Sequence, residues 1–324
     1  MTVRAHLTRR IVFSFITFFF IITLVFFLAR LTGDPLAELE NDPRMTPEVI
    51  ASIKALFGLD KPPHMQYLDF LKNMFLYGKF GYSVTYKRAV EDVILEKLPY
   101  TLALLIPSIT LSNYLAYRIG VEIAWRRTSK VSSALIVLSI FMSSVPYFWL
   151  AILFLYGFSV ALGITPIFGA VSPGMSFSWT LEWFIDYLWH YALPFTVLTL
   201  RSALSYMLYV RNSTIDILGE DYVFAAIARG FSNNYVKYKY VARNALLPIV
   251  TVLGLRYAFI IDGAILTETV FSYPGTGRLV YEAIISRDYW LLQGAMVILA
   301  ASVIIVNFII DLIYMYLDPR VRRG

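Results

Sequence analysis

The chain of 324 residues is dominated by apolar side chains: 58% of its residues are hydrophobic, 15% are charged, and the mean hydropathy is +0.65. This composition lies outside the range of soluble globular proteins and indicates a polytopic membrane protein. The sequence has no cysteine and three histidines, which excludes disulfides and thiol chemistry and argues against a metal cluster. The net charge of +6 is interpreted as a topology signal, not as a nucleic-acid-binding surface.

Residues 1–31 are predicted to form a cytoplasmic N-terminus and a retained first transmembrane helix. The apolar run 11–29 is about 20 residues long, enough to span a bilayer. A signal peptide or a twin-arginine signal would begin in a similar way, but no small-residue cleavage site follows the run. Residues 32–98 carry ten acidic and eight basic side chains, with helical patterns at 47–57 and 65–75 between Gly and Pro turn signals. They are predicted to form a small extracytoplasmic insert.

Five further apolar spans complete the predicted fold class, an all-α polytopic membrane protein with six transmembrane helices. These spans are 100–116, 132–162 with a break near Pro146, 187–209, 249–270 and 289–317. Residues 99–317 form the predicted five-helix core, which contains a cytoplasmic loop at 211–248 and is followed by a cytoplasmic tail at 318–324.

Basic residues orient the predicted spans. Fifteen Lys or Arg residues fall in the segments assigned to the cytoplasm, whereas the short outer loops 163–186 and 271–288 hold only Arg278 and Arg287. By the positive-inside rule, both termini and the loop 211–248 are cytoplasmic. The sequence has no P-loop, so the chain is not expected to be an enzyme that hydrolyses ATP. It shows no internal repeat, so an inverted-repeat secondary transporter gains no support.

The stretch from Asp221 to Pro248, DYVFAAIARGFSNNYVKYKYVARNALLP, is the longest polar and basic run in the second half of the chain. Its pattern predicts a helix that ends or bends at Gly230 and a second short helix capped by Ser232 or Asn233. The aromatic residues after the glycine would project apolar surface, as a contact for a groove on a soluble partner requires. A solvated loop with its basic residues at the lipid head groups explains the same pattern.

The same stretch resembles the EAA loop of the inner-membrane permeases of ABC importers. The resemblance lies in Ala225-Ala226-x-x-x-Gly230 and in Leu247-Pro248, at the longer spacing found in the dipeptide/oligopeptide/nickel branch. Phe224 stands where the loop's glutamate would be. Motifs similar to those of the B-type subunit of that branch cover essentially the whole chain: GDP at 33–35, GLDKP at 58–62, GYS at 81–83, LPYTL at 98–102, ETVFSYPG at 268–275, RDY at 287–289 and DPR at 318–320.

The resemblance implies the type I ABC importer permease fold and a prokaryotic inner or plasma membrane location. The chain would form half of the translocation pathway for dipeptides or oligopeptides, with oligosaccharides or nickel as alternative substrates. Its implied partners are a homologous second permease, two ABC ATPase subunits that bind ATP and Mg, and an extracytoplasmic substrate-binding protein. No cofactor, metal or catalytic residue is expected in the chain itself. A stand-alone channel or carrier, or a non-transporting scaffold, is a weaker interpretation.

The resemblance also implies a coupling helix after Gly230 that fits a cleft of one ATPase subunit. The coupling residues are then Ala225, Ala226, Arg229, Gly230, Phe231, Ser232, Asn233 and Tyr235. The small residues Ala225, Ala226 and Gly230 are predicted to be close-approach positions.

Charged residues in the predicted spans are candidates for a polar translocation pathway, because an unpaired charge there costs roughly 3 kcal/mol. The candidates are Arg201, Arg256, Asp262 and Glu268. Structural ion pairs, such as Arg201 with Asp262, are the alternative. Glu268, together with Asn307 and Asp311, matches the family pattern, which favours a structural role for Glu268.

Two further features belong to the predicted outer side. The turn 271–279 is interpreted either as an external gate or as a purely structural turn, and its gate candidates are Phe271, Pro274, Gly275 and Gly277. Tryptophans 149, 179, 183, 189 and 290 are interpreted as an interfacial belt, with stacking on sugars as the alternative.

Overall fold

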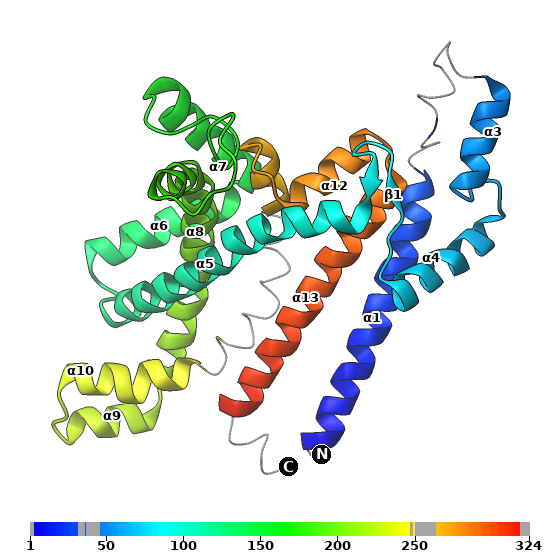
Figure 1. The fold of residues 1–324 in the computed structure, drawn as a ribbon. Helices are drawn as coiled ribbons and strands as arrows, with labels where there is room; N and C mark the ends of the chain where they lie inside the picture. The colour runs from blue at the N-terminus through cyan, green and yellow to red at the C-terminus, as the bar shows by residue number, and fades with distance from the viewer. Residues whose placement is uncertain (1–2, 32–35, 37–45, 247–248, 250–263, 318–324) are drawn as a thin grey trace. The chain divides into compact units, whose positions relative to one another are not determined.

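The computed structural model describes residues 3–31, 36, 46–246, 249 and 264–317, which are mostly helical (Figure 1). The chain divides into two compact units. The first unit comprises Met1–Arg10, Leu102–Tyr273 and Val303–Gly324, and the second comprises Ile11–Thr101 and Pro274–Ser302. Helices α1 (Val3–Leu31), α5 (Val90–Trp125) and α13 (Tyr289–Leu317) contain residues of both units.

Within the described residues, four helices are long and apolar enough to cross a membrane. They are α1 (Val3–Leu31), α5, α8 (Leu181–Leu218) and α13. A fifth candidate is a bent pair, α6 (Lys130–Ser144) with α7 (Tyr147–Phe154) and its continuation η1 (Leu155–Ala161), which turns by 106°. The break predicted near Pro146 is confirmed. It follows from the missing N–H of proline and from the extended backbone that proline imposes on Val145.

Two helices extend beyond the spans predicted for them. Helix α5 begins at Val90, inside the predicted insert, and contains Pro99. Helix α8 begins at Leu181, inside the predicted outer loop, where Thr180 caps it by accepting a hydrogen bond from the Trp183 N–H at 3.3 Å. Hydropathy marks only the apolar part of a helix, so it misses polar turns that capping and packing keep helical. Of the predicted span 249–270, only residues 249 and 264–270 are described, and all of them are helical.

The first unit is built on α8, which packs against α6 and α7. Ser139 of α6 donates a hydrogen bond to the Leu204 carbonyl of α8. Helix α5 also approaches α8 closely, because a Cβ on Gly120 would lie 2.6 Å from the Val210 Cβ and 2.9 Å from the Met207 carbonyl oxygen. At Gly120 a larger residue would therefore push these two helices apart.

The second unit contains α3 (Pro47–Leu56) and α4 (Pro63–Tyr77), which confirm the two helical patterns of the predicted insert. Its hydrophobic core joins α1, α4 and α13 through Ile22, Phe26, Phe70, Met74 and Val297. The unit also contains α12 (Thr276–Ile285).

A small hairpin departs from the all-α prediction. Strands β1 (Tyr82–Ser83) and β2 (Arg88–Ala89) pair antiparallel, and the Ser83 hydroxyl donates to the Asp288 carboxylate at 2.6 Å. The hairpin needs positive φ angles, +108° at Gly81 and +52° at Lys87. Strands of two residues are too short for an alternating hydrophobic pattern, so the sequence does not signal them.

Candidate functional site

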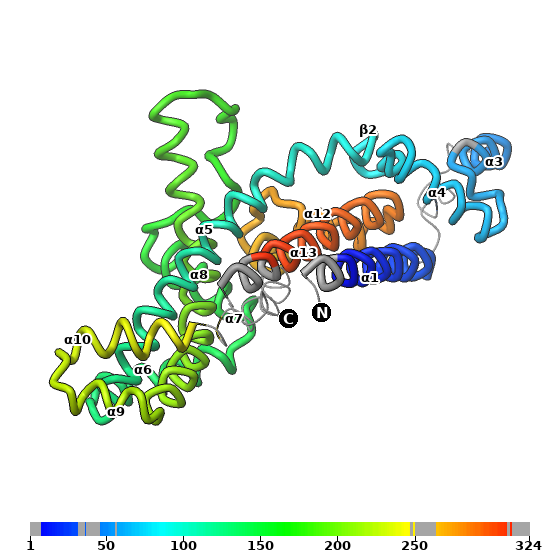
Figure 2. Tube along the Cα trace, turned by 90° about the horizontal axis from the view of Figure 1, so that it is seen from below, coloured from blue at the N-terminus to red at the C-terminus, as the bar shows by residue number. Residues whose placement is uncertain are grey.

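A helical hairpin follows α8 in the first unit and consists of α9 (Asp221–Ala228), α10 (Asn233–Tyr235) and η2 (Val236–Ala242). Figures 1 and 2 show α9 and α10 side by side at one end of that unit. Helix α8 runs to Leu218, and the Gly219-Glu220 turn separates it from α9. The predicted cytoplasmic loop 211–248 therefore starts as a continuation of α8.

The turn of the hairpin depends on two residues that the sequence pattern singles out. Gly230 has a φ of +80°, in the left-handed region that side chains with a Cβ rarely adopt. Ser232 caps α10 by accepting a hydrogen bond from the Tyr235 N–H at 3.4 Å. The predicted helix end and the predicted cap are both confirmed.

One face of the hairpin is a small hydrophobic core. Its buried members are Val223, Ala226, Val236 and Val241, and Trp125 of α5 packs against them. Burial of each valine contributes about 1.5–3 kcal/mol relative to exposure, so this core holds the two arms of the hairpin together. Helix α5 forms part of its support.

Next to this core, the hairpin exposes large apolar side chains. Phe224 is 58% exposed and Ile227, one turn further along α9, is 48% exposed. After the turn, Phe231 and Tyr235 are 42% and 45% exposed, and their rings lie 5.3 Å apart. Large apolar side chains that are exposed on a segment rich in polar and basic residues are typical of a surface that contacts another macromolecule.

The predicted coupling residues do not all occupy the positions expected of them. Arg229, Ser232 and Asn233 are exposed, as a contact surface requires. Ala226 is buried and fits a close-approach position, but Ala225 is exposed. At Gly230, a Cβ would meet no described atom within 4 Å. The described residues therefore place only Ala226 in close packing. For Ala225 and Gly230 the close-approach role stays a prediction, and within this chain the glycine supplies a backbone angle.

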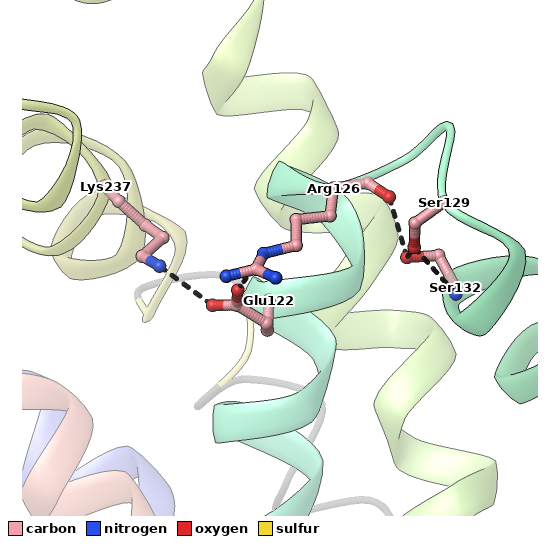
Figure 3. A network of polar contacts seen from close by, with 5 residues as sticks. All are labelled: Glu122, Arg126, Ser129, Ser132 and Lys237. Carbon is pink, nitrogen blue, oxygen red and sulfur yellow. Dashed lines mark hydrogen bonds and ion pairs between the residues drawn. The ribbon is translucent and has the colours of Figure 1, made fainter.

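An ion-pair network ties the hairpin to α5 (Figure 3). The Lys237 Nζ atom lies 2.8 Å from Glu122 Oε2, and the Arg126 Nε atom lies 2.6 Å from Glu122 Oε1. The Lys237 side chain is only 7% exposed. The backbone carbonyl of Arg126 in turn accepts a hydrogen bond from the Ser132 hydroxyl of α6 at 2.7 Å. The network thus links the hairpin, α5 and α6.

This network is not predicted from the sequence, in which Lys237 is one of several basic residues that mark topology. One signal was available, because Glu122 is the single acidic residue in a segment that otherwise holds Arg118, Arg126, Arg127 and Lys130. A lone carboxylate in such a segment predicts an ion pair, but the sequence does not say which of many cations is the partner.

Arg201 lies at the helix break and not in an ion pair with a described carboxylate. Its Nε donates to the Val145 carbonyl at 2.8 Å, and an Nη donates to the Ser143 carbonyl at 3.4 Å. Its guanidinium lies 3.8 Å from the centre of the Tyr147 ring. The arginine thereby satisfies carbonyl groups at the end of α6 and places a positive charge at the negative pole of that helix.

Of the other pathway candidates, the described structure includes only Glu268. Arg256 and Asp262, including the suggested pair of Asp262 with Arg201, lie outside the described residues. Glu268 is fully buried in the first unit, next to the turn in which the Tyr273 N–H donates to the Glu268 carbonyl at 2.8 Å. Burial fits both a residue of the translocation pathway and a structural residue, so both roles of Glu268 stay predictions.

The gate candidates fall on either side of the division between the units. Phe271, in the first unit, is buried, and its carbonyl accepts a hydrogen bond from the Gly169 N–H at 3.0 Å. In the second unit, Pro274 is half-buried, whereas Gly275, at the start of α12, and Gly277 are buried. Three of the four gate candidates therefore expose little of their surface to solvent in this chain.

The five tryptophans predicted for the outer side differ in exposure, and Trp290 is half-buried. Trp149, Trp179 and Trp189 are between 49% and 83% exposed, as an interfacial belt requires. Trp183 is buried and stacks on Tyr187 of the same helix, with ring centres 5.2 Å apart. Trp183 is therefore a packing residue and not an open stacking platform.

The long apolar helices define a multi-pass membrane protein. The chain belongs to the family of binding-protein-dependent transport system inner membrane components: the model of that family matches residues 116–323, and the model of its N-terminal region matches residues 3–105. The resemblance found in the sequence is thereby confirmed.

Relatives match the chain over nearly its whole length. A di/tripeptide transport system permease protein of Pseudomonas aeruginosa is 34% identical over 98% of this chain and 99% of that protein. A dipeptide transport system permease protein of Escherichia coli is 32% identical over 97% and 98%. An oligopeptide transport system permease protein of Bacillus subtilis is 32% identical over 98% and 99%.

The fold is similar to that of a solved transporter structure. A chain of the MetNI methionine ABC transporter, in an inward-facing conformation, superimposes with a TM-score of 0.56 at 16% identity. The match covers 70% of this chain and 96% of that chain. At this identity, the likeness supports the predicted type I importer permease fold and carries no information on substrate.

Proposed function

We propose that this chain forms half of the translocation pathway of an ATP-driven importer of dipeptides or oligopeptides. The observation that carries the proposal is the match, over nearly full length, to three permease proteins named for di/tripeptide, dipeptide and oligopeptide transport. Oligosaccharides and nickel stay as the alternative substrates. The partners in the proposal are a second permease, two ATPase subunits and an extracytoplasmic substrate-binding protein.

The helical hairpin is the proposed contact with an ATPase subunit. Phe224, Ile227, Phe231 and Tyr235 present apolar surface that a groove on a partner would bury. The buried core beneath them makes the hairpin a rigid lever, so that movement of the partner moves α8 and α5 with it. The chain itself supplies no catalytic group in this scheme, because ATP and Mg are bound by the ATPase subunits.

Uptake into proteoliposomes tests the function. The complex is purified through this chain after co-expression with its partner subunits and supplied with ATP inside the vesicle and liganded binding protein outside. We expect ATP-dependent uptake of a labelled dipeptide or tetrapeptide, and no uptake of an oligosaccharide or of nickel. If the vesicles take up an oligosaccharide or nickel but no peptide, the proposed substrate is wrong, and the imported compound replaces it.

The hairpin contact has its own test. We expect Phe231→Asp to weaken ATPase binding about 30-fold or more, because it places a charge in a desolvated hot spot, while membrane insertion is unchanged. Leu76→Asp is the control, since Leu76 is 69% exposed and belongs to α4, in the other unit. ATPase co-purification with each variant is measured at equal membrane levels. Equal recovery with both variants would refute the contact.

A further inference from the structure

We propose that the Glu122–Lys237 ion pair transmits movement of the helical hairpin to helix α5, so that the two residues are positioning residues for coupling. The proposal rests on the proposed function, because it needs a partner that moves the hairpin. It adds a specific route for that movement, through a carboxylate and an ammonium group 115 residues apart in the chain.

The geometry of the pair favours a mechanical role over a surface contact. Lys237 Nζ and Glu122 Oε2 are 2.8 Å apart, and the lysine side chain is 7% exposed. The other carboxylate oxygen, Oε1, lies 2.6 Å from the Arg126 Nε atom, so Glu122, whose side chain is 35% exposed, has a cation at each oxygen (Figure 3). A charge-assisted hydrogen bond between two oriented groups is directional, whereas exposed ion pairs contribute little.

The ion pair complements an apolar contact that has no preferred direction. Trp125 of α5 packs against the hydrophobic core of the hairpin, but hydrophobic burial is non-directional and lets surfaces slide. The pair lies on the same end of α5, three residues before Trp125. It therefore fixes the register between the hairpin and α5 that packing alone leaves adjustable.

Helix α5 is suited to carry a displacement. Its prolines, Pro99 and Pro107, lie in its N-terminal half, and the segment after Pro107, which holds Glu122, contains no proline that would interrupt its hydrogen bonds. Gly120, two residues before Glu122, brings α5 against α8 so closely that a Cβ would overlap Val210. A displacement of Glu122 is consequently passed to both helices. Lys237 itself lies in η2, a π-helical segment. Such segments are rare in proteins as a whole, but where they occur they are frequently found at functional sites.

The test uses the complete importer in proteoliposomes and three variants of this chain: Glu122→Gln, Lys237→Met and the double variant. Lys239→Met is the matched control, because Lys239 lies two residues along the same segment and is exposed. The measurements are the thermal stability of the complex, the stimulation of ATP hydrolysis by liganded binding protein, and the number of ATP molecules hydrolysed per peptide imported.

We expect each single variant to lower the stimulation by about fivefold or more. In the double variant no buried charge is left without its partner, so thermal stability returns towards that of the wild type. The stimulation nevertheless stays lost, and the number of ATP molecules per peptide rises. Lys239→Met behaves as wild type in all three measurements.

A double variant that couples like the wild type would overturn the inference. So would a double variant that fails to assemble, because the pair would then be a folding requirement. A wild-type complex that neither retains an ATPase nor imports peptide would instead refute the proposed function. The two failures are thus distinguished by the wild type alone.

Discussion

Individual residues in the hairpin have different physical tasks. Phe231 and Tyr235 offer apolar surface, Lys237 makes a buried ion pair, and Gly230 supplies a backbone angle. Only the last task restricts the residue type through the main chain. It leads to a graded prediction, because residues differ in how readily they adopt positive φ.

We expect Gly230→Ala to destabilise the hairpin by about 1–2 kcal/mol, the cost of the left-handed conformation for a residue with a Cβ. Gly230→Asn should cost less, since asparagine tolerates that conformation better. Amide hydrogen exchange across residues 221–242 of the purified protein measures the effect. The control is Gly219→Ala at the other end of α9, where φ is −81°.

Loss of protection to the same extent in Gly219→Ala and Gly230→Ala would contradict this account. It would show that both glycines are needed for another reason, such as contact with a partner chain. Both variants keep the hydrophobic core of the hairpin intact, so the comparison reports on the backbone.

Among the helical elements, the break between α6 and α7 is the feature that most departs from a straight transmembrane helix. Pro146 removes a backbone donor and forces the bend, and the last carbonyl groups of α6 are then without helical partners. Arg201 of α8 donates to two of these carbonyls. The arginine thereby stabilises a bend that proline creates.

We expect Arg201→Met to lower the stability of the protein in detergent by about 1.5–3 kcal/mol, because it removes the hydrogen bonds of a charged donor to the last carbonyl groups of α6. Arg201→Lys should recover part of this loss, since a single ammonium group replaces the planar guanidinium. Thermal unfolding of the purified protein is the measurement. Arg127→Met, at an exposed arginine, serves as the control.

Uptake distinguishes this structural role from a role in the pathway. If Arg201 only holds the bend, Arg201→Lys imports peptide with an unchanged apparent affinity. An altered affinity at unchanged stability would instead place the side chain on the translocation pathway, as its charge predicts.

For the molecule as a whole, orientation in the membrane determines which proteins can reach the hairpin. The distribution of arginine and lysine predicts that the hairpin and both termini are cytoplasmic. Because the chain contains no cysteine, a single introduced thiol reports its own side of the membrane without background.

We expect Ser232→Cys to react with an impermeant maleimide only in inside-out vesicles, and Ser176→Cys only in intact cells or right-side-out vesicles. Both serines are exposed in the described structure, so accessibility within the fold is not limiting. Labelling of both thiols from the same side would overturn the predicted topology and, with it, the contact of the hairpin with a cytoplasmic ATPase.

Local chemistry makes much of this protein predictable. The apolar runs, the break near Pro146, the helix end at Gly230 and the cap at Ser232 each depend on a few neighbouring residues. The motifs along the chain likewise indicate the transporter family, because each is a short run of adjacent residues. Helix ends are less predictable: α5 starts at Val90 and α8 extends to Leu218, because caps and packing keep polar turns helical.

The amino-acid sequence thus determines that this is a membrane protein, which family it belongs to and where along the chain the helical hairpin occurs. Each of these depends on composition or on short motifs. Packing of the helices decides which charges meet: Lys237 with Glu122, and Arg201 with the carbonyls of α6. It also exposes Ala225 while it buries Ala226. Pairs of this kind join residues far apart in the chain, and their identity depends on tertiary contacts that no local pattern encodes.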